Sequence, residues 1–245
     1  VQSALARAML ALALNQVGDD QRAAKLAEEA REASEAGDHG TAAIVRVCGA
    51  VAAVGARNVS SAAALTADAL RHAEAIDYPF SRLAATLLEA WVAEQQADEK
   101  AAVDAYMRVL EGANQPYFAN HAAFALARLG SHALGRGNLL EAEELFRRAL
   151  AAADGASPWA TAYARVELGR ARAAAGDADT AARLYRQVLD ASVRPRPHRM
   201  RERFFVTIAG NPATGALHGL ADLAAARGEA EAADELRARA ELAAA

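Results

Sequence analysis

Histidine and cysteine, the side chains best suited to hold a metal or to act as nucleophiles, are sparse in this chain of 245 residues. Cys48 is the single cysteine, so a disulfide within the chain and a thiolate metal cluster are both excluded. Its neighbours Val47, Ala50 and Val51 predict a buried, inert thiol. No two of the six histidines stand four residues apart, whereas a metal site needs three or four converging ligands. We therefore expect no metal and no cofactor, and histidines at the surface or at helix ends.

The motifs that mark common enzyme classes are absent. The chain contains no Walker phosphate loop, no HExxH pair and no Gly-x-Ser-x-Gly elbow. Its one glycine-rich segment, residues 210–215 (GNPATG), follows no clear strand, so we interpret it as a turn that precedes the last helices. The sequence therefore predicts a protein that is not an enzyme.

A run of arginines between residues 193 and 211 is the feature with the clearest capacity to bind anions. Guanidinium groups suit phosphates and carboxylates, so this segment could contact nucleic acid, a nucleotide phosphate or an acidic neighbouring domain. The alternative is a solvated loop whose arginines bond the carbonyl ends of helices. The five residues are Arg194, Arg196, Arg199, Arg201 and Arg203, and His198 lies among them.

Composition predicts that helices carry these residues. The chain is rich in alanine, the best helix former, and aromatic residues make up only 5% of it. Lys25 and Lys100 are the only lysines among 27 basic residues, a bias typical of GC-rich genomes and suggestive of an actinobacterial source. A net charge of −4 does not indicate a nucleic-acid binder, and we expect no direct DNA binding.

No apolar stretch is long enough to span a membrane and no signal peptide is visible, so the expected location is the cytoplasm. The sequence begins at Val1, already within a helical pattern, and we expect a fragment of a larger protein.

An internal repeat organises the chain. Similar helices end in leucines that lie 40, 40 and 39 residues apart, and several glycines are followed by a residue that can cap the next helix. The leucines are Leu70, Leu110, Leu150 and Leu189, and the turn pairs are Gly18-Asp19, Gly137-Asn138, Gly176-Asp177 and Gly228-Glu229.

The fourth repeat resembles the tetratricopeptide repeat (TPR), in which small residues let paired helices approach and large ones fill the space between them. The second and third repeats match less well, with Thr66 at an aromatic position and Ala90 at a glycine position. The matching residues are Leu126, Leu129, Gly130, Ala133, Ala142, Phe146 and Ala149. The resemblance implies an all-α, TPR-like α-α superhelix of about five to six helix pairs.

The predicted organisation is one domain with one interruption. Five repeats cover residues 1–192, an Arg/Pro-rich interruption covers 193–211, and a last helix pair on the same solenoid covers 212–245. The step from Gly176 to Gly228 is 52 residues, 13 more than the preceding step, and the prolines at 195 and 197 oppose an ordinary helix. Residues 198–208 could still form a short extra helix. The helix pairs are expected at about 1–36, 39–77, 79–113, 117–155, 158–192 and 212–244.

The TPR resemblance also implies a binding surface, because the first helix of each pair lines the concave face in that family. Trp91, Phe124 and Tyr163 fall on first helices of three successive pairs, and Ser131 and Arg170 share their face. The set is mostly apolar, unlike the Lys, Arg and Asn of carboxylate-clamping members, and suits an amphipathic helix. The alternative is that these side chains are ordinary core, buried by tight packing or by the C-terminal helices.

The C-terminal third also resembles the end of large actinobacterial regulators of the Streptomyces antibiotic regulatory protein and bacterial transcriptional activator type. The resemblance rests on the Arg-Pro segment and on Leu220-Ala221, Leu223-Ala224 and Arg227-Gly228. It implies a non-catalytic interaction or sensor arm that contacts a protein, a peptide or other domains of its parent regulator. A free-standing TPR adaptor that binds a peptide or partner helix is the alternative.

Overall fold

The chain forms helix pairs that are grouped into two compact units. The computed structural model describes residues 2–16, 19–35, 37–155, 157–192 and 200–244. Unit 1 is Val1–Ala113 and unit 2 is Asn114–Ala245, a boundary that the repeat pattern did not place. Among the described residues, no helix combines the length and the apolar character needed to cross a membrane.

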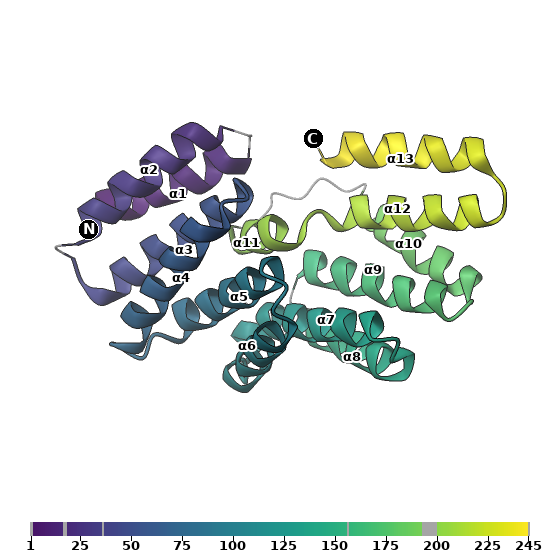
Figure 1. Cartoon of the computed structure of the whole chain (residues 1–245), viewed down its shortest axis with the longest axis horizontal. Coiled ribbons are helices and arrows are strands. Elements are labelled where there is room, and N and C mark those ends of the chain that lie inside the picture. Colours follow the sequence, from purple (N-terminus) through teal and green to yellow (C-terminus); the bar gives the residue numbers. More distant parts are fainter. Residues whose placement is uncertain (1, 17–18, 36, 156, 193–199, 245) are drawn as a thin grey trace. The chain divides into compact units, whose positions relative to one another are not determined.

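Unit 1 is a stack of three helix pairs. Within it, α1 packs on α2, α3 on α4 and α5 on α6, while the first helices α1, α3 and α5 also pack successively on one another (Figure 1). Its helices are α1 (Gln2–Gln16), α2 (Asp20–Ser34), α3 (His39–Gly55), α4 (Val59–Glu74), α5 (Pro79–Gln95) and α6 (Glu99–Gly112).

Unit 2 repeats this arrangement and adds one helix to it. The pairs are α7 with α8, α9 with α10, and α12 with α13, and the first helices α7, α9 and α12 are again neighbours (Figure 1). The additional helix, α11, lies between α10 and α12 in the sequence. The elements are a short 3₁₀ turn η1 (Pro116–Phe118), α7 (Ala119–Gly135), α8 (Leu139–Ala153), α9 (Pro158–Ala174), α10 (Ala178–Ser192), α11 (Met200–Ala209), α12 (Pro212–Ala226) and α13 (Ala230–Ala244).

The turns within the pairs close in one recurrent way. After α7, Gly137 takes a left-handed φ of +77°, the Asn138 N–H donates to the Ala133 carbonyl at 2.9 Å, and the Asn138 side chain then caps α8. Gly176 and Asp177 do the same between α9 and α10. This 6→1 closure satisfies carbonyls at the end of one helix, and the cap satisfies an N–H at the start of the next. The predicted glycine turns are confirmed at residues 137, 176 and 228, whereas Gly18 lies outside the described residues.

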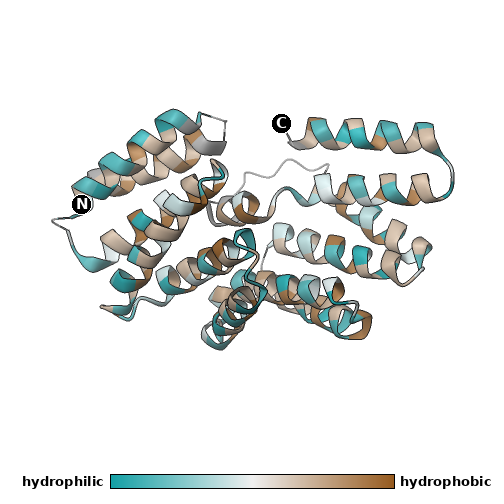
Figure 2. Ribbon diagram, in the orientation of Figure 1, coloured by the Kyte–Doolittle hydropathy of each residue, from teal (hydrophilic) through white to brown (hydrophobic). Residues whose placement is uncertain are grey.

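Small residues let the paired helices approach closely. A Cβ placed on Gly130 would lie 2.6 Å from Cε1 of Phe146, and one on Gly169 would lie 2.5 Å from Cε1 of Tyr185. Glycine is therefore required by contact at these two positions. Alanines fill most of the remaining interface, and Figure 2 shows hydrophobic and hydrophilic residues on different sides of most helices.

The sequence-based prediction of an all-α fold of five to six helix pairs is confirmed. The six pairs begin and end within a few residues of the predicted boundaries, and no strand is found in the described ranges. The extra helix expected near 198–208 is present as α11.

Candidate partner-binding surface

An aromatic cluster lies where the N-terminal halves of α7 and α9 meet. Phe124 of α7 and Tyr163 of α9 have ring centroids 5.5 Å apart, and Trp159 stacks on Tyr163 at 5.1 Å with an interplanar angle of 10°. Phe124 to Trp159 measures 6.2 Å. Residues 159 and 163 are one helical turn apart, which places both rings on one face of α9. We call these rings, together with Phe118, His121 and Phe205, the aromatic cluster.

Phe205 of α11 completes this cluster from outside the helix pairs. Its ring stacks on Trp159 at 5.3 Å and lies 5.7 Å from Phe124 and 5.3 Å from His121. Phe205 is 2% exposed, and the two rings that it contacts on α7 and α9, Phe124 and Trp159, are 3% and 6% exposed. Such ring pairs add to the free energy of burial, so this contact is a substantial part of how α11 is held.

A polar strip continues the same faces of α7 and α9 toward their C-terminal ends. Glu167 is 2% exposed and accepts hydrogen bonds from the Ser131 hydroxyl at 3.1 Å and from Nη1 of Arg170 at 2.6 Å. The hydroxyl of Tyr163 accepts from Nη1 of Arg128 at 3.4 Å. A buried carboxylate is costly unless it is paired and hydrogen-bonded, and Glu167 is both.

The electrostatics of this surface favour binding over acid-base chemistry. Burial, with the nearby Glu167 carboxylate, raises the pKa of Tyr163 to about 12, so the phenol stays protonated at neutral pH. Glu167 is neutralised by Arg170, whose side chain is 49% exposed. The rings of the cluster are buried against one another and against Phe205, and the partly exposed Arg170 guanidinium beside them can pair with an acidic group.

The structure brings together four of the five residues that the sequence predicted for the groove. Phe124, Ser131, Tyr163 and Arg170 all lie in the aromatic cluster or the polar strip of unit 2, whereas Trp91 lies half-buried on α5 of unit 1. The role of the five as a docking site stays a prediction, and the contact of Phe205 with the buried Phe124 is the kind of packing that the alternative describes.

The basic segment is only partly described. Arg194, Arg196 and Arg199 lie outside the described residues. Arg201 and Arg203 belong to α11, but their side chains are not described. The prediction that these five arginines bind an anionic partner therefore stays a prediction.

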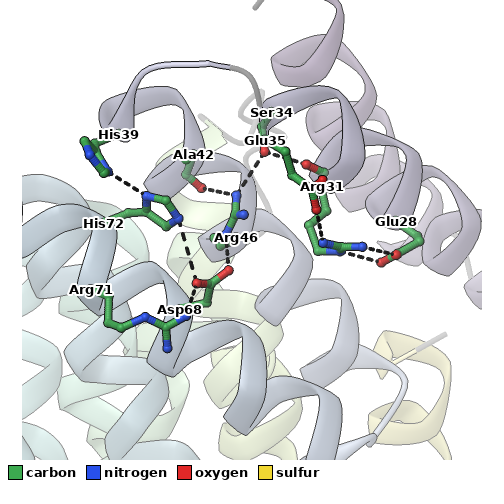
Figure 3. Close-up of polar contacts among 10 residues, drawn as sticks. All are labelled: Glu28, Arg31, Ser34, Glu35, His39, Ala42, Arg46, Asp68, Arg71 and His72. Atoms are coloured by element: carbon green, nitrogen blue, oxygen red, sulfur yellow. Dashed lines mark hydrogen bonds and ion pairs between the residues drawn. The ribbon is translucent and has the colours of Figure 1, made fainter.

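Unit 1 contains a polar network that the sequence did not reveal (Figure 3). Arg46 of α3 is 5% exposed; its Nε donates to Asp68 of α4, and its Nη1 donates to the Ser34 hydroxyl of α2 at 2.9 Å. Asp68 also accepts from Arg71 at 2.5 Å. These bonds link three helices of two successive pairs. Their partners are up to 22 positions apart in the sequence, so no local pattern indicates them.

A histidine pair lies at one edge of this network. Nδ1 of His39 and Nδ1 of His72 are 2.9 Å apart, so one ring donates and the other accepts, and Nε2 of His72 lies 3.8 Å from Asp68 (Figure 3). The described residues contain no group of three or more His, Cys, Asp or Glu side chains arranged to hold a metal. Cys48 is buried as predicted, and burial raises the pKa of its thiol to about 12, which makes it a poor nucleophile.

A groove of about 330 Å³ between α10, α12 and α13 is the other candidate surface, and sequence reasoning did not find it. Leucines and alanines from all three helices form its apolar part, and arginines and one glutamate line the remainder. The apolar lining residues are Ala182, Leu189, Leu220, Leu223, Ala224, Ala232 and Leu236.

Comparison with known proteins identifies the class of fold. No protein-family model and no curated protein matches the chain. Among solved structures, it is similar to PilW, a type IV pilus biogenesis factor, with 17% identity, a TM-score of 0.64 and coverage of 98% of this chain and 92% of that one. It is similar to the apo quorum sensor NprR from B. thuringiensis with 11% identity, a TM-score of 0.62 and coverage of 90% and 70%.

A third similar structure is that of a longer protein. It is a Signal Transduction ATPase with Numerous Domains from Pyrococcus horikoshii that carries a tetratricopeptide repeat sensor, with 15% identity and a TM-score of 0.62. The match covers 98% of this chain and 41% of that one. At these identities the similarities establish the fold alone: the chain is an all-α protein of the TPR-like class.

Proposed function

We propose that this chain is a non-catalytic protein-interaction or sensor module that binds an amphipathic helix of a partner protein or of another domain. The observation that carries the proposal is the aromatic cluster, which gathers Phe124, Trp159 and Tyr163 beside the half-exposed Arg170. Aromatic and arginine side chains dominate the energetics of protein interfaces. A helix that lays its apolar face on the rings can direct an acidic side chain at the guanidinium.

The more specific form of this proposal is the regulatory arm of a multidomain transcriptional regulator in the cytoplasm of an actinobacterium. Support comes from the resemblance of the C-terminal third to such regulators. The similarity to a multidomain ATPase whose TPR part is described as a sensor also supports it. In this role the arm would contact the other domains of its own protein and would bind neither DNA nor membrane directly.

A free-standing adaptor is the second candidate. The observation that favours it is that the chain matches PilW over 92% of that protein's length, so a set of helix pairs of this size can be nearly a whole protein. The reading frame around this sequence separates the two candidates: a Walker motif upstream favours the regulator.

Alanine variants of Phe124, Trp159 and Tyr163 test the binding surface. Each is measured for thermal stability and, by calorimetry, for binding to the domains encoded in the same reading frame or to a co-purifying partner. Loss of one anchor is expected to weaken binding about thirtyfold, equivalent to about 2 kcal/mol. Leu140→Ala is the control, because Leu140 is 84% exposed on α8, outside the surface. Lower stability with unchanged binding in all three variants would show that the rings are only core.

A further inference from the structure

The helix α11 is an insertion into the stack of helix pairs. In unit 2, α10 packs on α12 as α8 packs on α9, and α9 packs on α12 as α7 packs on α9. The pairs therefore succeed one another without any contribution from α11. The sequence shows the same thing as 13 additional residues between the turn glycines at 176 and 228. The stack of pairs does not require α11, so the presence of this helix points to another role.

Through Phe205, α11 packs on the aromatic face of α7 and α9 as a bound helix would. Phe205 and Ile208, three residues apart on one face of α11, are 2% and 8% exposed. The other described side chains of the helix, at positions 204, 206, 207 and 209, are half-buried. An aromatic anchor followed one turn later by an aliphatic one is the pattern by which an amphipathic helix occupies an apolar groove.

The connection to α12 is short, and Asn211 ties it to α13 by donating from Nδ2 to the Ala243 carbonyl at 3.2 Å. Gly210 has a left-handed φ of +85°, and its carbonyl accepts from Nε1 of Trp159 at 3.4 Å. Asn211 then caps α12 by accepting from the Ala213 N–H at 3.0 Å. Because only these two residues separate α11 from α12, the helix is held at a high effective concentration beside the rings that it covers. A modest intrinsic affinity is then enough to keep the face occupied.

We propose that α11 is the internal ligand of a helix-binding site. The site consists of the cluster rings that α7 and α9 supply, without Phe205 of α11. Its external ligand is a short amphipathic helix with an aromatic residue and an aliphatic residue three positions later. That helix displaces α11 and takes the places of Phe205 and Ile208. This inference rests on the proposed function and deepens it, because it states the chemistry of the partner and what the partner must remove.

The test uses the full chain and a fluorescein-labelled peptide with the sequence of residues 200–211 (MRERFFVTIAGN), with fluorescence anisotropy as the readout. Phe205→Ala in the chain weakens the internal ligand, so it is expected to bind the peptide at least tenfold more tightly than the unaltered chain does. Val206→Ala is the matched control on the same helix, since Val206 lies outside the anchor stripe, and it should bind as the unaltered chain does. A peptide that carries the Phe205→Ala change should bind at least tenfold more weakly to the Phe205→Ala chain.

Hydrogen exchange on the unaltered chain supplies a measurement that needs no variant. Amides of α11 are expected to exchange at least tenfold faster than those of α9 and α12, and faster again when the peptide is present. Exchange of α11 as slow as that of α9, unchanged by peptide, would overturn the inference and leave partner binding possible elsewhere on the chain. Fast exchange of α11 combined with no peptide binding to the Phe205→Ala chain would instead refute helix binding at this face, and the proposed function with it.

Discussion

The two units build the same helix pair from different residues. In unit 2, glycines at 130 and 169 lie directly under aromatic rings, whereas unit 1 places Ala90 sixteen residues before the buried Tyr106. Unit 2 closes its turns with glycine, whereas Arg57 and Ala97 take the same left-handed conformation in unit 1, with φ of +56° and +57°. The fold therefore requires a close approach and a left-handed residue at fixed places, and glycine is one of several ways to supply them.

The units also differ in how they stabilise contacts between successive pairs. Unit 2 packs rings between its first helices, which also contact α11, and adds the buried Glu167 that accepts from Ser131. Unit 1 relies on the buried Arg46 and its bonds to Asp68 and Ser34. Apolar packing tolerates small changes of fit, whereas a buried ion pair loses its value when either partner is removed. The two units should accordingly respond to different substitutions.

The largest effect is expected where glycine lies under a ring. Gly130→Leu and Ala142→Leu should each lower the free energy of unfolding by about 3 kcal/mol or more, because overpacking forces the helices of the pair apart. Urea unfolding followed by circular dichroism measures the change. Gly135→Ala is the control on the same helix, since nothing lies within 4 Å of a Cβ at that position. If Gly135→Ala destabilised as much as Gly130→Leu, contact with the Phe146 ring would not be the reason for glycine at position 130.

The second effect sharpens the contrast in unit 1. Arg46→Met removes the buried guanidinium and leaves Asp68 and Ser34 without their shared donor. We expect a loss of about 2 kcal/mol in the free energy of unfolding, below the value for a fully buried pair because the Asp68 side chain is 22% exposed. Lys100→Met, which breaks the exposed pair with Asp104, should change little. Equal effects of the two variants would show that Arg46 contributes no more than a surface charge.

The third effect exchanges the turn chemistry of the two units. Ala97→Gly relieves a left-handed alanine and should raise the free energy of unfolding by about 1 kcal/mol, whereas Gly137→Ala should lower it by about 1 kcal/mol. The flanking caps are alike, because Asp98 caps α6 as Asn138 caps α8, so the comparison isolates the backbone conformation. Melting temperatures that move in the same direction for both variants would contradict this account.

The sequence predicted the fold well because periodicity and turn chemistry are local. The glycine turns and the small residues around Gly130 marked the helix pairs to within a few residues. The left-handed conformation of Arg57 and Ala97 had no such mark, since neither residue favours it. Only the cap residues that follow them, Asn58 and Asp98, point to a turn there.

The candidate site was predictable only in part. Phe124, Tyr163 and Arg170 were found because the TPR resemblance assigns a face to each first helix. Trp159 was missed, although it stands one turn before Tyr163 on that face. The seat of Phe205 was also missed, because the contact joins segments about 80 residues apart, and no sequence period encodes where an inserted helix folds back.

The smallest expected effect is a pH dependence that arises from His72 of unit 1. Desolvation, followed by the nearby Arg46, lowers the pKa of His72, and His39 acts in the same direction (Figure 3). Asp68 opposes them, and Arg71 on the same helix adds to the lowering. A histidine whose pKa is lower in the folded chain than in the unfolded chain favours unfolding when it binds a proton. Its contribution to stability is therefore complete above the unfolded pKa of about 6.5 and is lost as the pH falls through the folded value. Asp68, whose pKa is also lowered, loses its contribution only in more acidic solution, as the pH falls below about 3.8.

Between pH 7.5 and 5.5 the free energy of unfolding should thus fall more steeply for the unaltered chain than for His72→Gln. His218→Gln, at an exposed position on α12, is the control and should keep the slope of the unaltered chain. A slope that is the same in all three proteins would mean that protonation of His72 does not contribute to the pH dependence of stability.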